Sequence, residues 1–162
     1  MFVWRLPGRP QVNRRPLGVR TNIPMSAWRR KARELFPEDG RYLDTAPSIQ
    51  DWLNRLLQDL RHAGEKYSSG PNAEERSFEF ARWCLKRSQN QSLKRAVLEG
   101  FVVHLGALPN ARDRIPRLIG RETFRSTKRL FRQTLEPEAY EQVVAAFAAY
   151  QLAGPPPGWA DA

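Results

Sequence analysis

The sequence contains little of the side-chain chemistry on which enzymes and metal sites depend. One cysteine and two histidines occur in 162 residues. An intrachain disulfide is therefore excluded, and the paired Cys/His spacing of a structural zinc site is missing. No glycine-rich phosphate loop or HExxH motif is present. We expect no metal, no cofactor and no small-molecule substrate.

Long apolar runs are also missing. No run approaches the ~18 residues that a membrane-spanning helix needs, so we expect no membrane partner. A secretory signal is not expected either, because Arg5, Pro7 and Arg9 interrupt the first ten residues. The single cysteine suits a reducing compartment, and we expect a cytoplasmic protein.

Residues 1–33 contain no acidic residue and carry a charge of +9, and the net charge of the whole chain is +10. Residues 34–111 carry −1, residues 112–132 carry +6 and residues 133–162 carry −4. The body of the chain is thus nearly neutral. Its positive charge lies in one N-terminal arm and one internal segment, so a high isoelectric point alone overstates the case for nucleic acid.

The two ends of the chain are rich in proline and glycine. Residues 1–24 contain four prolines and two glycines without periodicity, which predicts a disordered basic arm. Alternatively, translation starts at Met25, whose following residues resemble a natural protein start. The composition of residues 153–162 predicts a flexible tail.

Apolar residues recur at spacings of three and four between these ends, and no alternating strand pattern occurs. The spacing predicts helices over residues 26–36, 48–63, 72–88, 91–105, 110–119, 122–133 and 137–152. The fold class is therefore all-α, a compact single-domain bundle of about six to seven helices over residues 25–152.

Several helix ends carry recognisable signals. Ser48 with Asp51, and Asn72 with Glu75, have the spacing of an N-cap and its third residue, and Pro137 suits a first helical position. In the helix over 91–105, the spacing places seven residues on one buried side: Leu93, Ala96, Val97, Gly100, Phe101, His104 and Leu105.

Two pairs of residues have the side-chain types of known catalytic or metal sites. Packed helices could bring Cys84 and His104 together as a nucleophile and its base. A buried cysteine and a hydrogen-bonded core histidine are the commoner explanation, and we favour it. Asp59 and His62 have the Glu-x-x-His spacing of bundle di-metal sites, but the pattern occurs once and lacks further inward carboxylates.

The basic segment offers one candidate binding surface. Arg121, Arg125, Lys128 and Arg132 are spaced to form a single helical stripe, and Arg117 precedes it. Such a stripe could bind phosphates or an acidic partner. Alternatively it is an ordinary solvated face whose arginine stems cover apolar neighbours. Arg112, Arg114 and Arg117 could extend the patch, and Glu136, Glu138 and Glu141 could neutralise part of it.

Residues 75–131 contain an aromatic-rich helix, a polar turn with Asn, a helix ending in His-Leu and a following Leu/Gly segment. The residues that define this order are Phe78, Ala81, Asn90, Phe101, His104, Leu105, Leu118, Gly120 and Phe131. In this order the chain resembles small bacterial all-helical proteins of unknown function. Some of these families are encoded beside toxins, so the resemblance implies an immunity or antitoxin role. It implies no catalytic residue.

Two functions follow as hypotheses. The first is a non-enzymatic protein-interaction module, immunity-like, whose partner has an acidic surface. The second is a nucleic-acid-associated protein that binds the phosphate backbone through the basic arm and the helix within 112–132. An enzyme using Cys84 or His104 is a third and less favoured hypothesis.

Overall fold

The computed structural model describes residues 25–62 and 72–153, and within these ranges it is helical without any strand. The all-α fold class is confirmed. The predicted N-terminal arm, residues 154–162 of the predicted tail and the last residue of the predicted helix over 48–63 lie outside the described residues. Within them, no helix is both long and apolar enough to cross a bilayer. The helices are α1 (Ala27–Leu35), α2 (Gly40–Thr45), α3 (Ile49–Arg61), α4 (Ala73–Lys86), α5 (Gln91–Val97), α6 (Val103–Leu105), α7 (Ile115–Leu118), α8 (Arg121–Thr134) and α9 (Pro137–Ala153).

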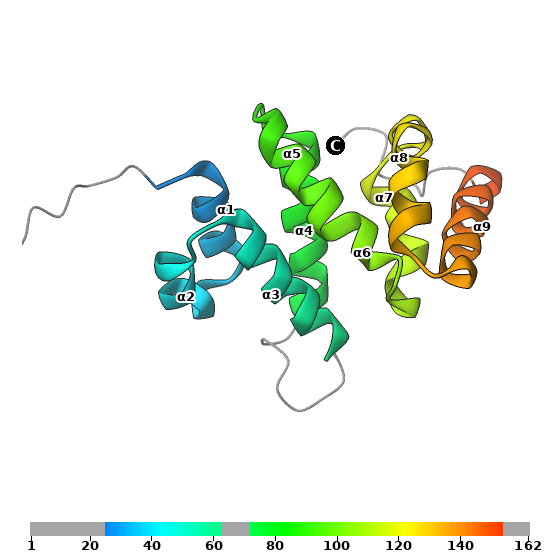
Figure 1. Cartoon of the computed structure of the whole chain (residues 1–162). Helices are drawn as coiled ribbons and strands as arrows, with labels where there is room; N and C mark the ends of the chain where they lie inside the picture. Colours follow the sequence, from blue (N-terminus) through cyan, green and yellow to red (C-terminus); the bar gives the residue numbers. More distant parts are fainter. Residues whose placement is uncertain (1–24, 63–71, 154–162) are drawn as a thin grey trace, which may run out of the picture.

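The helices form two groups joined by one interrupted helix. Helices α1 to α4 lie on one side of the molecule and α7 to α9 on the other (Figure 1). Helices α5 and α6 run between the groups and are continuous through a π-helical turn over Leu98–Val102. A 3₁₀ segment over Pro109–Arg114 leads into α7. One hydrophobic core extends through both groups.

An aromatic cluster around Trp52 fixes the first group. The Trp52 ring is fully buried and meets the rings of Phe36 and Phe80 edge-on, at centroid distances of 5.1 and 6.4 Å. These three residues come from α3, the end of α1 and α4. Because edge-to-face rings add to the free energy of burial, the cluster holds three helices at one point.

Two ion pairs tie the 3₁₀ turn at Pro37–Asp39 to the neighbouring helices. Buried Asp39 accepts a hydrogen bond from Arg55 of α3 at 2.6 Å. Burial raises the pKa of the Asp39 carboxyl, and the Arg55 guanidinium opposes that rise. Glu38 lies 2.6 Å from Arg76 of α4, and the hydrogen bond from Arg76 lowers the pKa of the Glu38 carboxyl. Positive charge in this half is therefore used to hold helices together.

Helix α2 is an element that the sequence did not predict. The first predicted helix ends at residue 36 and the next begins at residue 48, yet Gly40 has helical φ and ψ and begins α2. The helix has six residues, too few for a periodic pattern to be recognised. Its Leu43 is fully buried, and Asp44 pairs with Arg33 of α1. Tertiary contacts, rather than local propensity, stabilise this short helix.

The predicted caps have mixed outcomes. The Ser48 hydroxyl accepts a hydrogen bond from the Asp51 backbone N–H at 3.2 Å and donates to the Asp51 carboxylate, so this cap is confirmed. The predicted cap at Asn72 is wrong. Asn72 precedes α4 with φ of 67° and makes no side-chain cap, because the left-handed backbone turns its side chain away from the capping position. The prediction of Pro137 as the first residue of α9 is confirmed.

The buried face of the helix over 91–105 was predicted only in part. Val102 and Val103 are fully buried, whereas Ala96 and His104 are only half-buried. The cause is the π turn, in which the Val103 N–H donates to the Leu98 carbonyl five residues earlier. The extra residue per turn shifts the side chains off the 3.6-residue period, so consecutive residues are buried.

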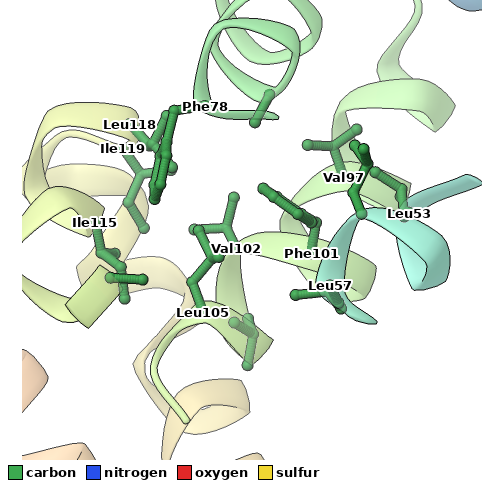
Figure 2. Packing of buried hydrophobic residues seen from close by; sticks show 14 of the residues in the cluster. Leu53, Leu57, Phe78, Val97, Phe101, Val102, Leu105, Ile115, Leu118 and Ile119 are labelled. Atoms are coloured by element: carbon green, nitrogen blue, oxygen red, sulfur yellow. The ribbon is translucent and has the colours of Figure 1, made fainter. Parts of the chain in front are cut away.

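The π turn lets this helix face both groups at once. Figure 2 shows Phe101 on the side of Leu53 and Leu57 of α3, while Val102 and Leu105 lie between Phe101 and Ile115 of α7 in this view. A straight α-helix would keep its apolar side chains on one stripe. The shift of face therefore positions α7 and, after it, α8.

A tight packing point at Gly106 provides a test of this junction. A Cβ there would lie 2.4 Å from Leu135 Cδ1 and 3.2 Å from the Val103 carbonyl oxygen, and Leu135 is buried. We predict that Gly106→Ala lowers the free energy of unfolding by about 1–3 kcal/mol through overpacking, measured by urea denaturation.

Gly40→Ala is the matched control. A Cβ at Gly40 would meet nothing within 4 Å, and its backbone is helical, so we expect a gain of about 0.4–1 kcal/mol. Equal effects of the two substitutions would show that Gly106 is not a packing constraint.

Candidate functional site

Helix α8 carries the candidate surface, and aromatic packing fixes its orientation. Phe124 and Phe131 of α8 are buried and meet at a centroid distance of 5.3 Å. Phe124 also stacks on Phe147 of α9 at 4.1 Å. The Thr127 hydroxyl donates to the Thr123 carbonyl at 2.6 Å, which satisfies a polar group on the half-buried side. The opposite side of α8 is therefore held toward solvent.

The predicted stripe lies beside the buried side, displaced from Phe124 and Phe131 by roughly 80° of helix rotation. Arg121, Arg125, Lys128 and Arg132 are all exposed, and none of them forms a salt bridge with another described residue. With ~100° of rotation and 1.5 Å of rise per residue, the four side chains lie within an arc of about 60° along about 16 Å of helix. The prediction of one exposed face is confirmed, while its role as a binding surface remains a prediction.

A fifth cation, Arg129, belongs to the same surface but was not in the predicted set. It is exposed and lies four residues after Arg125, which widens the arc to about 100°. The place of Arg129 beside the stripe could have been predicted from a helical wheel, because any cation at this spacing adjoins the stripe. The name "α8 arc" is used below for Arg121, Arg125, Lys128, Arg129 and Arg132.

Arg112 and Arg114 do not extend the patch in the structure. Arg112 is half-buried, and its Nε donates to the Gly106 carbonyl at 2.7 Å. Arg114 pairs with Glu74 and Glu75 of α4 at 2.8 and 2.6 Å. Both arginines therefore connect neighbouring segments of the fold, and the pattern of charge alone does not reveal such partners.

Arg117 does not extend the stripe, and the glutamates at the start of α9 form no salt bridge with it in the described ranges. Arg117 is exposed on α7, but it lines a depression together with Phe78 and Arg114 rather than continuing the α8 arc. Glu136, Glu138 and Glu141 form no salt bridge to the arc within residues 25–62 and 72–153. Neutralisation of the stripe by α9 is therefore not observed.

The residues considered for catalysis differ in their burial. Cys84 is fully buried in α4, and this burial raises the pKa of its thiol to about 12. His104 is half-buried in α6, and His62 is exposed at the end of α3. Within the part of the chain that the structure describes, no cluster of three or more His, Cys, Asp or Glu residues could hold a metal ion.

Comparisons with known proteins add no assignment: no protein family, curated protein or solved structure matches the chain. The α8 arc must therefore be judged from its own geometry.

The thiol of Cys84 gives a direct test for a hidden nucleophile. A thiolate is the reactive form, and a pKa of about 12 leaves almost none at neutral pH. We predict that Cys84 reacts with an aromatic disulfide reagent only as fast as the protein opens, and at once in denaturant. Rapid labelling of the folded protein at neutral pH would contradict this prediction and reopen an enzymatic role.

Proposed function

We propose that the protein is a non-enzymatic nucleic-acid-associated module that binds the phosphate backbone through the α8 arc. One observation carries the proposal: five exposed cations lie on one helix face and have no acidic partner among the described residues. Four of the five are arginines, whose planar guanidinium binds phosphate through two parallel hydrogen bonds.

The composition of the surface favours nucleic acid over a protein partner. Protein–protein interfaces have a core rich in aromatic and apolar side chains and poor in charge. The α8 arc has the reverse composition, and the large hydrophobic side chain exposed in the described ranges is Leu152, on α9. Interfaces with DNA are more polar and far more positive.

The protein-interaction hypothesis rests on the expected resemblance to small bacterial helical proteins of unknown function, some of which are encoded beside toxins. Its partner would need an acidic surface, since α8 offers little apolar area. Such a complex would also weaken with salt, but it would not release the condensed counterions of a nucleic acid.

The salt dependence of binding tests the proposal. We predict that the full-length protein binds duplex DNA with an affinity that falls steeply with salt, and that Arg125→Ala/Arg132→Ala weakens this binding. The slope of log K against log salt should become shallower by about one for each phosphate that is no longer neutralised. Fluorescence anisotropy over a salt series measures both quantities, and the N-terminal arginines are the same in every variant.

Arg41→Ala/Arg61→Ala is the matched control. It removes the same charge from exposed positions on α2 and α3, so it should change affinity little and leave the slope nearly unchanged. Both double variants should remain folded by circular dichroism, because all four side chains are exposed. Failure of the wild-type protein to bind at moderate salt, or equal losses in the two double variants, would refute the proposal.

A further inference from the structure

A second basic surface surrounds the outer side of α4. Three depressions, of about 290, 360 and 470 Å³, adjoin one another there. The first and second share Glu79 and Arg82, the first and third share Lys86, and the second and third share Leu118. These three neighbouring depressions, together called the α4 trough, are lined by residues of α1, α4, α5, α7 and the start of α8.

The trough is lined by many cations, and part of this charge is already neutralised. Lys31 pairs with Glu34 and Glu79, Arg95 with Glu99, and Arg114 with two glutamates. Four other lining cations make no salt bridge to any described residue, namely Lys86, Arg87, Lys94 and Arg117. The trough therefore retains positive charge along its length.

Apolar and aromatic surface separates these charges, which distinguishes the trough from the α8 arc. Half-buried Trp83 lines the first depression beside Lys86 and Arg87. Phe78 lines the second, and Leu85 and Leu98 line the third. A ligand that matches this surface has flat apolar groups alternating with negative charges.

We propose that the α4 trough binds single-stranded nucleic acid, with a base stacked on Trp83 and the adjoining phosphates near Lys86, Arg87 and Lys94. Unpaired bases expose their faces, whereas a duplex hides them inside the stack. Proteins that bind single strands combine a positive groove with aromatic platforms. The proposal uses residues outside the α8 arc, so it stands or falls separately from phosphate binding by α8.

Two substitutions at Trp83 separate stacking from packing. Trp83→Phe keeps an aromatic face, and Trp83→Leu keeps apolar bulk without one. With labelled oligothymidylate as the probe, Trp83→Leu should weaken binding by about 5- to 150-fold, the usual effect of removing one stacking platform. Trp83→Phe should retain most of the affinity, and a blunt duplex should bind both variants like the wild type.

The melting temperatures of the two variants provide the folding control, since both side chains can fill the half-buried site. Lys86→Gln/Lys94→Gln should also reduce the salt slope for the single strand by about one for each phosphate that is no longer neutralised. Wild-type affinity of Trp83→Leu for oligothymidylate would overturn the proposal, and so would an equal loss of affinity for the duplex. Displacement of oligothymidylate by polyglutamate of equal charge with equal potency would also overturn it, and would assign the trough to an acidic peptide.

The outcomes distinguish the two surfaces. Single-strand binding that depends on Trp83, without duplex binding, supports the trough and refutes the role of α8. Duplex binding that depends on Arg125 and Arg132, with no effect of Trp83, supports α8 and refutes the trough.

Discussion

The buried π turn over Leu98–Val102 is the constraint on which the two halves of the molecule depend. It lies inside the core, where Gly100, Phe101 and Val102 are all buried. Its extra residue moves the apolar face of the helix from α3 toward α7, so a single continuous helix can pack against both groups within one core. π turns are often found at functional sites. Here Gly100, Phe101 and Val102 of the turn face the core while Glu99 is exposed, and the effect of the turn is architectural: it positions α7 and, after it, α8.

Arginine serves two different purposes in the two halves of the fold. In the first half, Arg55 and Arg76 meet the carboxylates of Asp39 and Glu38, and Arg76 also lies over the Phe36 ring at 4.9 Å. Such half-buried pairs satisfy groups that would otherwise lose hydration without compensation. On α8 the guanidinium groups meet no carboxylate of the described residues. The net charge is therefore used unevenly: part of the positive charge around α1 to α4 is paired within the fold, whereas the cations of the α8 arc have no acidic partner among the described residues.

The helices that a periodic pattern could identify were long and amphipathic, and α3 and α8 are examples. The periodic pattern missed features that depend on local backbone geometry or on tertiary contacts. Val102 and Val103 are buried through a π turn, and α2 forms through contacts made at a distance along the chain. The exposed stripe was predictable because the charged residues and the apolar residues of α8 both follow the helical period. The α4 trough was not predictable, since its lining residues come from helices that only the tertiary fold brings together.

The arrangement of like charges on α8 opposes the stability of the helix. Five pairs of cations on this helix are separated by three or four residues, and each such pair destabilises a helix by about 0.2–0.5 kcal/mol. The chain uses the opposite arrangement elsewhere, since Arg95 pairs with Glu99 one turn later at 2.7 Å. Solubility alone would be met equally well by alternating charges on α8. Burial of Phe124 and Phe131 holds the helix in place despite the repulsion, and an anionic partner is the agent that would relieve it.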